Sequence, residues 1–377
     1  QYGDGEFVAG ETVTGGAGTD TILFTADTQT VADAEFANKT LIEAITTKDG
    51  TNSVTLGTVA AAATDSLTVT GGTGVDTINA ADLGESVTIV GGDGNDVLTG
   101  SDQADNISGG ANDNTLSGGE GADQFNVTGD DEITDFGVGG ADKVDIAVGA
   151  TLAATVTQDY QAATVNDIDN EADVADAVFT VSNDIDFDAS AATSTNNGIT
   201  ITAAGNSAAS GLKGTDKGDV ITGGSGADSL LGEAGDDVLI FASESELKND
   251  ATVVGGAGTD TVRIASGSNP VVLLDGTFTK VAQVEVLDLD GTGDQFVTLG
   301  ASASLAFNNG VTVTTDADAA SLNLQGGTAS KSINATGTNN ADTIIGGSGN
   351  DTITGGAGND NLSGGAGDNV YQYGDGE

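Results

Sequence analysis

Single apolar residues alternate with polar ones over many short segments of the chain. The pattern is clear in SLTVT (66–70), SVTIV (86–90) and NGVTVTT (309–315). Because successive side chains of a β-strand point to opposite faces, a period of two predicts short strands with one buried face. No apolar run approaches the ~20 residues that a helix needs to cross a bilayer. The pattern therefore predicts an all-β chain that does not span a membrane.

A nine-residue period is superimposed on this alternation in three blocks, at residues 91–126, 214–240 and 337–372. The first block reads GGDGNDVLT, GSDQADNIS, GGANDNTLS, GGEGADQFN. Glycine occupies positions one, two and often four of each unit, aspartate position six, and one large apolar residue position eight. Isolated copies of the unit begin at Gly15, Gly71 and Gly255.

Each nonapeptide predicts one tight turn and one very short strand. Glycine adopts backbone angles that other residues resist, so the first six positions can form a turn whose carbonyl groups point inward. Positions seven to nine form the strand, and two successive nonapeptides make one turn of a flattened helix whose strands stack in parallel. Each core layer is then one residue thick. The predicted inward side chains at position eight are Leu98, Ile107, Leu116, Phe125, Ile221, Leu230, Leu239, Ile344, Ile353, Leu362 and Tyr371.

Composition restricts the chemistry. Acidic residues outnumber basic ones 58 to 9, which gives a formal net charge of −49. This charge opposes compaction unless cations neutralise it, and it argues against nucleic acid as a partner. Disorder or halophilic solvation is the alternative explanation of such acidity, but many of these carboxylates recur at a fixed spacing. Cys and His are absent, which excludes disulfides, thiolate zinc sites and imidazole ligands, and leaves oxygen ligands.

The nonapeptides resemble the GGxGxDxUx consensus of the repeats-in-toxin family, the hemolysin-type calcium-binding proteins. Eleven contiguous units, about a quarter of the chain, carry this resemblance, and residues 131–146 resemble the segment that commonly closes such rolls. The resemblance implies a right-handed parallel β-roll or β-solenoid with calcium-binding turns. It also implies calcium as the cofactor, secretion of the chain, and a location outside the cell or on a bacterial cell surface.

In that family each ion lies between two turns and is bound by their position-six aspartates and by carbonyl groups of the turns. About five paired sites are therefore expected. Two of them should be weaker, because the dipeptide DN replaces ND and puts asparagine at position six. The complete pairs are Asp105 with Asp123, Asp219 with Asp237, and Asp342 with Asp360, and the imperfect pairs are Asp96 with Asn114 and Asp351 with Asn369.

The implied ligand set also includes Asp228 and the glycines at position one. The isolated copies place Asp20, Asp76 and Asp260 at position six, but none has a recognisable partner two nonapeptides away. These three are expected to be turn residues rather than ligands. The position-one glycines of the set are Gly91, Gly109, Gly118, Gly214, Gly223, Gly232, Gly346, Gly355 and Gly364.

Longer repeats divide the chain. Residues 33–57 align with residues 275–300 and GGAGTDT precedes both, which predicts two related modules. The hexapeptide QYGDGE occurs at residues 1–6 and again at 372–377. Chance is one explanation in a chain rich in Gly and Asp, and one period of a longer polymeric protein is the other, which we favour. The predicted segments are a solenoid module (1–88), a repeat block with its closing segment (89–146), a β-rich spacer (147–210), a second block (211–254), a second module (255–336) and a third block (337–377).

The sequence favours a structural function over catalysis. HExxH is impossible without His, and no GxSxG motif occurs. A carboxylate-pair glycosidase is compatible with the composition, but no segment resembles a globular catalytic domain. The prediction is a calcium-stabilised protein that self-associates into a surface layer or filament. The alternative is the calcium-stiffened stalk of a large secreted adhesin. A cell-surface polysaccharide is a further candidate partner.

Overall fold

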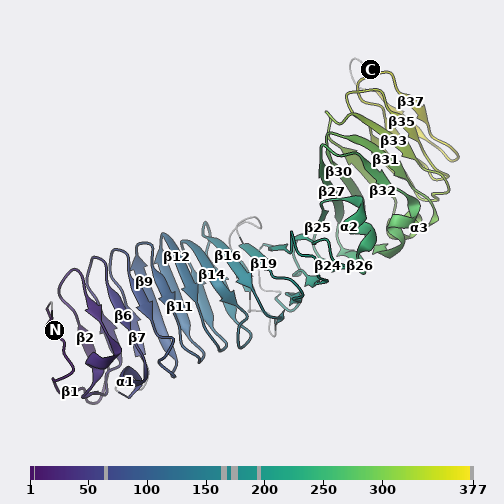
Figure 1. Cartoon of the computed structure of the whole chain (residues 1–377). Coiled ribbons are helices and arrows are strands. Elements are labelled where there is room, and N and C mark those ends of the chain that lie inside the picture. The colour runs from purple at the N-terminus through teal and green to yellow at the C-terminus, as the bar shows by residue number, and fades with distance from the viewer. Residues whose placement is uncertain (4, 63–66, 163–167, 171–176, 193–196, 374–377) are drawn as a thin grey trace. The chain divides into compact units, whose positions relative to one another are not determined.

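The computed structural model of the chain describes residues 1–3, 5–62, 67–162, 168–170, 177–192 and 197–373 (Figure 1). Its regular structure is almost entirely β-strand, and the strands stack in parallel ladders one turn apart. The chain is therefore an all-β parallel β-solenoid, as the repeats predict. It forms two compact units, residues 1–185 with 191–200 and residues 186–190 with 201–377. The finer division into six segments stays a prediction.

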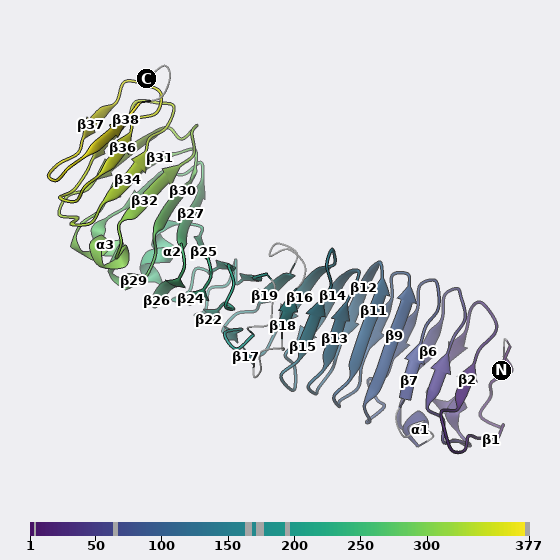
Figure 2. The ribbon, with the colours of Figure 1, turned by 180° about the vertical axis from the view of Figure 1, so that it is seen from behind.

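The first unit has two long parallel sheets, which Figures 1 and 2 show from opposite sides. One contains β2 (Thr21–Leu23), β5 (Ala44–Thr46), β7 (Leu67–Thr70), β9 (Val87–Asp93), β11 (Asn106–Ala111), β13 (Gln124–Val127), β15 (Lys143–Ile146) and β18 (Ile168–Asn170). The other contains β3 (Thr30–Val31), β6 (Ser53–Thr55), β8 (Thr77–Asn79), β10 (Val97–Thr99), β12 (Asp113–Ser117), β14 (Asp130–Phe136), β16 (Thr151–Val156) and β19 (Ala177–Val181). A short pair is formed by β1 (Val13–Thr14) and β4 (Lys39–Thr40).

The second unit has three parallel ladders. The first contains β20 (Phe187–Asp188), β22 (Gly211–Lys213), β24 (Ser229–Ala234), β26 (Thr252–Ala257) and β29 (Val281–Ala282). The second contains β23 (Val220–Thr222), β25 (Val238–Phe241), β27 (Thr261–Gly267), β30 (Val286–Gly291), β32 (Val311–Thr315), β34 (Ile333–Thr336), β36 (Thr352–Thr354) and β38 (Val370–Gln372). The third contains β28 (Val271–Leu273), β31 (Asp294–Thr298), β33 (Ser321–Gln325), β35 (Thr343–Ile345) and β37 (Asn361–Ser363).

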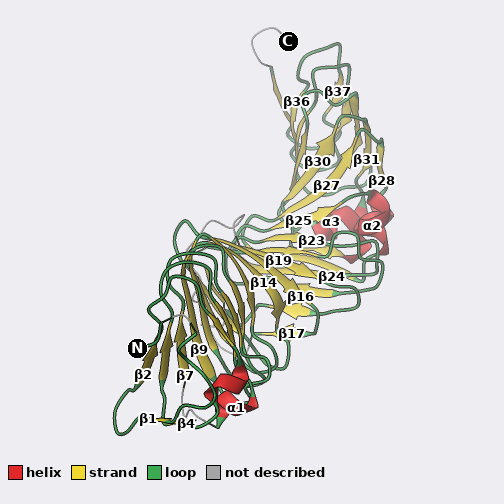
Figure 3. Ribbon diagram, turned by 60° about the vertical axis from the view of Figure 1, so that its left-hand side comes forward, coloured by secondary structure: helices red, strands yellow, loops and turns green. Residues whose placement is uncertain are grey.

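The described helices are short and lie at turns of the solenoid, four of them in the two modules and α2 at the end of the second block (Figure 3). Two further strands are β17 (Tyr160–Gln161) and β21 (Thr200–Thr202). The helices are the 3-10 helices η1 (Asp33–Phe36) and η3 (Asp275–Lys280), and the α-helices α1 (Thr58–Ala61), α2 (Glu244–Asn249) and α3 (Ala301–Ala306).

The core is a stack of single side chains. Within the blocks, strands that are two nonapeptides apart pair with like residues in register, as Leu98 with Leu116 and Ile221 with Leu239. Nine of the eleven predicted inward residues are buried. Leu362 is half-buried, and Tyr371 is 41% exposed. These two belong to the last turn, on which no further described turn stacks, and their position in the stack explains the difference.

Turns outside the blocks are longer than two nonapeptides. Ile22 pairs with Ile45 and Val69 pairs with Ile89, so each of these turns contains additional residues. The additional residues form the short helices and loops at the turns, and the ladder that contains these two pairs continues through them. The solenoid thus accepts turns of unequal length as long as the strands keep their register.

The two sequence modules have the same local structure. The Asp33 carboxylate accepts the N–H groups that begin α1, and Asp275 does the same for α3. Leu41 and Gln283 both have a positive φ, 57° and 54°, although neither is glycine. The alignment of residues 33–57 with residues 275–300 is therefore a repeat of structure as well as of sequence.

We expect Ile107→Ala to lower the free energy of unfolding by about 2–5 kcal/mol. Ile107 is buried between Ile89 and Phe125 in its ladder, so truncation opens a cavity in a core one residue thick. Urea unfolding in calcium measures the loss. Val97→Ala is the control, because Val97 is 44% exposed, and it should change stability by less than about 0.5 kcal/mol. Equal losses in the two variants would contradict the layered core.

Candidate metal sites

The position-six carboxylates of successive turns form hydrogen-bonded ladders. In each predicted complete pair, the backbone N–H of the earlier aspartate donates to Oδ1 of the later one. The N···O distances are 2.8 Å from Asp105 to Asp123, 2.8 Å from Asp219 to Asp237 and 3.0 Å from Asp342 to Asp360. The fold thus brings the two members of every complete pair together.

The two imperfect pairs have the same backbone contact but a different side-chain group at the turn. Asp96 and Asp351 donate their N–H groups to Oδ1 of Asn114 and Asn369, each over 2.9 Å. Nδ2 of Asn369 then faces the position-two and position-four carbonyl oxygens of its own turn, at 3.5 and 3.4 Å. Nδ2 of Asn114 donates to its own position-four carbonyl at 3.2 Å. An amide N–H group therefore lies where the oxygens of the turn converge.

The ladders extend beyond the nonapeptide blocks, to residues that a fixed repeat spacing does not reveal. Asp76 and Asp260, expected to be isolated turn residues, have partners 20 and 23 residues away. Asp142 and Asp250 join the ladders as well. The additional contacts run from Asp76 N–H to Asp96 Oδ1 (2.7 Å), Asp123 to Asp142 (2.9 Å), Asp228 to Asp250 (3.1 Å) and Asp237 to Asp260 (2.9 Å).

The aligned modules contain a sequence feature that marks the ladder contacts across these longer turns. Glu43 and Glu285 occupy equivalent places, and Oε2 of each accepts the N–H of Asp20 or Asp260. The N···O distances are 2.8 and 3.0 Å. An acidic residue just before each aligned strand therefore marks the next member of a ladder, whatever the length of the turn.

In three turns the aspartate is saturated by its own turn. We call residues 100–105, 214–219 and 337–342 the closed turns. Each has Ser or Thr at position two, whose N–H donates to Oδ2 of the position-six aspartate at 2.5 to 2.6 Å. The hydroxyl group donates to Oδ1 of the same carboxylate at 3.1 Å. Both carboxylate oxygens of a closed turn therefore have donors within the turn.

In four other turns the second carboxylate oxygen has no such donor. We call residues 91–96, 118–123, 232–237 and 255–260 the open turns. Oδ2 of their position-six aspartates, Asp96, Asp123, Asp237 and Asp260, is buried and has no hydrogen-bond partner. The backbone is left-handed at positions two and four, as at Gly92 (φ 120°) and Gly94 (φ 133°), which turns the N–H of position two away from the carboxylate. A buried oxygen without a partner is costly unless a cation compensates it.

Burial raises the pKa of all four open-turn carboxyl groups above its ordinary value. Burial, together with repulsion from the nearby ladder carboxylates, raises the pKa of Asp123 and Asp237 to about 8. Burial also raises the pKa of Asp96 to about 6. Hydrogen bonds from the ladder N–H groups lower these pKa values, but burial has the larger effect. A bound cation at the unpartnered oxygen would favour the ionised form and lower these pKa values.

Glycine at position one is required by the oxygens of the site. A Cβ on Gly91 would lie 2.3 Å from Oδ2 of Asp96 and 2.4 Å from the carbonyl oxygen of Gly109 in the next turn. A Cβ on Gly232 would lie 2.2 Å from Oδ2 of Asp237 and 2.5 Å from the corresponding carbonyl oxygen. The unpartnered carboxylate oxygen and a carbonyl oxygen therefore face the same small space between two turns.

This donor set fits calcium. The ion takes six to eight oxygens at about 2.3–2.6 Å and accepts backbone carbonyls as readily as carboxylates. Within the ranges that the structure describes, no three acidic side chains converge on one point. Carbonyl groups would accordingly supply most of the ligands at each open turn, and the aspartate would supply the charge.

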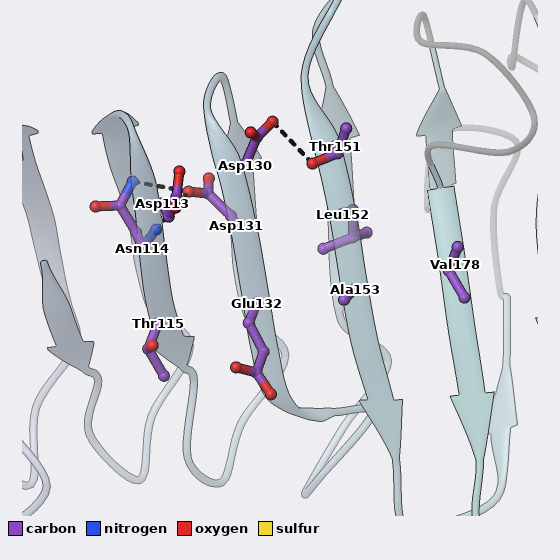
Figure 4. A pocket seen from close by; sticks show the side chains of 10 residues that line it. All are labelled: Asp113, Asn114, Thr115, Asp130, Asp131, Glu132, Thr151, Leu152, Ala153 and Val178. Carbon is purple, nitrogen blue, oxygen red and sulfur yellow. Dashed lines mark hydrogen bonds between the residues drawn. The ribbon is translucent and has the colours of Figure 1, made fainter. Parts of the chain in front are cut away.

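We call residues 109–114 and 364–369 the inverted turns, because DN replaces ND there and asparagine holds position six. A pocket of about 430 Å³ lies beside β12, β14 and β16, next to the inverted turn that contains Asn114 (Figure 4). Asn114 Nδ2 donates to Oδ1 of Asp131 at 2.7 Å, and the Thr151 hydroxyl donates to Asp130 at 2.8 Å. Oδ2 of Asp131 is buried without a partner, and burial raises the pKa of this group to about 6. The ladder thus continues one turn beyond the asparagine, to a residue absent from the predicted ligands.

Parallel strands joined by Gly-Asp turns, with buried carboxylates facing carbonyl oxygens, are typical of a calcium-binding repeat solenoid. A family model described as the RTX calcium-binding nonapeptide repeat (4 copies) matches residues 88–125, 212–243 and 336–371. These three segments match that family, which confirms the resemblance and indicates calcium binding. No curated protein and no solved structure gives a significant match.

We expect Asp123→Asn to bind one calcium ion fewer and to lose about 1–3 kcal/mol of stability in saturating calcium. The asparagine keeps the Oδ1 acceptor for Asp105 and places an amide N–H among the turn oxygens, as Asn369 does. Equilibrium dialysis counts the ions. The control is Ser101→Ala, which alters a closed turn and should leave the ion count unchanged. An unchanged count in the asparagine variant would exclude an ion at Asp123.

The reciprocal change is Asn114→Asp. It replaces the amide N–H by a second carboxylate oxygen in a turn whose backbone is already left-handed at Gly110 (φ 97°) and Asn112 (φ 77°). We expect this variant to bind one additional calcium ion at saturation. The midpoint of its calcium-induced folding should lie at a lower calcium concentration than that of the unmodified chain. Calcium titration with calorimetry tests this, and unaltered stoichiometry would show that the turn does not become a site.

Proposed function

We propose that this chain is an extracellular structural protein whose solenoid is stabilised by calcium and which self-associates into a surface layer or filament. The observation that supports it is the recurrence, in both units, of turns with a buried and unpartnered carboxylate oxygen. A bound cation would stabilise such oxygens, and open turns in both units would link the stability of each unit to that cation.

Within this proposal the ions lie at the open turns. Asp96, Asp123, Asp237 and Asp260 supply the charge, and Asp360 belongs with them because its turn has left-handed glycines at positions two and four, with φ of 88° and 122°. In each predicted complete pair, the later aspartate therefore contacts the ion. The earlier one, Asp105, Asp219 or Asp342, is held by its closed turn and positions its partner through the ladder N–H.

Calcium binding and folding should be coupled. The formal charge of −49 opposes compaction, and ligands from different turns meet only in the folded chain, so binding free energy adds to folding free energy. Extracellular calcium modules bind at about 10⁻⁴–10⁻³ M, which favours an unfolded chain in the cytosol and a folded one outside the cell. Secretion and an extracellular location are therefore part of the proposal. None of the described helices is long and apolar enough to cross a membrane.

The second candidate is the stalk of a large secreted adhesin. The stacked turns within each unit favour it, because each turn contacts only its neighbours and such stacks form stiff rods. A stalk needs calcium for stiffness but no contact between copies. Self-association in calcium therefore separates the two functions.

We expect the purified chain to lose most of its β-structure in a chelator and to regain it with calcium at about 10⁻⁴–10⁻³ M. Circular dichroism measures the transition, and dynamic light scattering of the same samples measures assembly. Magnesium at equal concentration is the control, because it requires octahedral geometry and retains water ligands. Full β-structure in the chelator, or none by ~10 mM calcium, would contradict calcium-dependent folding.

A further inference from the structure

The pocket beside β12, β14 and β16 lies inside the first unit, with stacked strands on both sides. Strand β10 pairs with β12 before it, and β19 pairs with β16 after it. Most of its lining comes from β14, β16 and β19, which follow Phe125, the last residue that the family model matches in this block. The nonapeptide repeat therefore does not explain the groups that line this pocket.

Asp131 forms the floor of the pocket and is 3% exposed. Its Oδ1 accepts the backbone N–H of Asn114 at 3.3 Å and Nδ2 of Asn114 at 2.7 Å, whereas Oδ2 is buried and has no hydrogen-bond partner. The register places Leu152 opposite Asp131 in the next turn, so the ladder ends here. The charge of Asp131 therefore lies beneath the pocket, and none of the ion pairs among the described residues includes it.

Three exposed carboxylates surround the opening of the pocket. Asp113 on β12 is opposite Asp130 on β14 in register, and Glu132 lies two residues beyond Asp130 (Figure 4). The Thr151 hydroxyl donates to Oδ1 of Asp130 at 2.8 Å and holds this carboxylate in place. None of the described residues that line the pocket is basic. Because like charges on adjacent strands repel each other, this arrangement favours a positively charged ligand.

The positions of these groups favour several separate positive charges over one metal ion. Calcium needs six to eight oxygens around one point, and no three acidic side chains of the described residues converge in that way. The inverted turn does not supply the missing oxygens, because its Asn112 carbonyl already accepts Nδ2 of Asn114 and the N–H of Asp130. Asp130 and Glu132 lie on the same face of β14, and two residues along a strand are about 7 Å apart. Two ammonium groups on a short alkyl chain can reach both carboxylates.

An apolar wall completes the pocket on the side of β16 and β19. Leu152, Ala153 and Val178 form this wall, and Ala153 is exposed. Methylene chains pack on apolar surfaces of this kind while their charged ends remain in water, as lysine side chains do. The volume of about 430 Å³ is within the range of small-ligand pockets. The pocket therefore combines separate negative charges with a surface for a hydrocarbon chain.

From this combination we propose that the pocket binds an aliphatic diamine or polyamine. One ammonium group contacts the exposed carboxylate of Asp130, a second contacts that of Glu132, and the methylene chain between them packs on Ala153 and Val178. The buried charge of Asp131 attracts the ligand from beneath without contacting it. This binding activity goes beyond the proposed structural function, and it depends neither on self-association nor on the number of calcium ions.

The experiment uses the full chain in ~1 mM calcium, with circular dichroism to verify folding. Isothermal titration calorimetry compares 1,5-diaminopentane with 1-aminopentane, which has the same alkyl chain but only one ammonium group. We expect the diamine to bind about tenfold more tightly, because its second ammonium group gains charge-assisted hydrogen bonds that the monoamine lacks.

Two variants test the pocket, and each removes one negative charge. Glu132→Gln changes an exposed carboxylate, and Asp131→Asn changes the floor while Oδ1 remains an acceptor for Asn114. Asp145→Asn is the matched control, because Asp145 is exposed on β15 in the other sheet of the same unit and does not line the pocket. We expect both pocket variants to bind the diamine about tenfold more weakly and the control to bind it as the unmodified chain does.

Equal weakening in all three variants overturns the proposal, because it reflects a general attraction to an acidic chain. Unchanged affinity in folded Glu132→Gln, or equal affinity for the diamine and the monoamine, overturns it as well. Raising calcium from ~1 to ~10 mM at constant ionic strength should leave the affinity for the diamine unchanged, whereas a proportional loss identifies a calcium site and overturns the proposal. A chain that stays monomeric but binds the diamine as expected supports this inference and contradicts only self-association.

Discussion

The structure depends on one contact that recurs between turns, the hydrogen bond from a position-six backbone N–H to the carboxylate or amide oxygen of the next turn. This contact joins successive turns and holds an acidic side chain in the interior of a chain with a formal charge of −49. A buried carboxylate has two oxygens, and the ladder uses one of them. The fate of the second oxygen distinguishes the turns from one another.

The described turns treat this second oxygen in several ways, and three of them show the range. A closed turn such as residues 100–105 provides a hydroxyl and an N–H of its own. An inverted turn replaces the carboxylate by an amide, as at Asn369. An open turn such as residues 118–123 leaves Oδ2 of Asp123 unpartnered beside carbonyl oxygens. The first two satisfy the turn locally, whereas the third leaves an oxygen that a cation would complete. The proposed calcium ions at open turns would therefore link the stability of the stack to calcium.

The same contact explains how turns of unequal length form one stack. In a one-dimensional stack each turn contacts the two turns beside it. Asp237 donates its N–H to Asp260 across 23 residues, as Asp219 donates to Asp237 across 18 residues. The ladder therefore continues where the nonapeptide spacing ends.

Much of this protein followed from sequence alone. The nine-residue period determined the parallel solenoid, the single-residue core layers and the complete carboxylate pairs, because two nonapeptides per turn place like residues above one another. Tertiary structure decided what the period does not encode. Asp142, Asp250 and Asp260 join ladders across longer turns, since register depends on strand pairing and not on the number of residues in a loop. The choice between an open and a closed turn depends on backbone angles at positions two and four, which the recurring aspartate alone does not reveal.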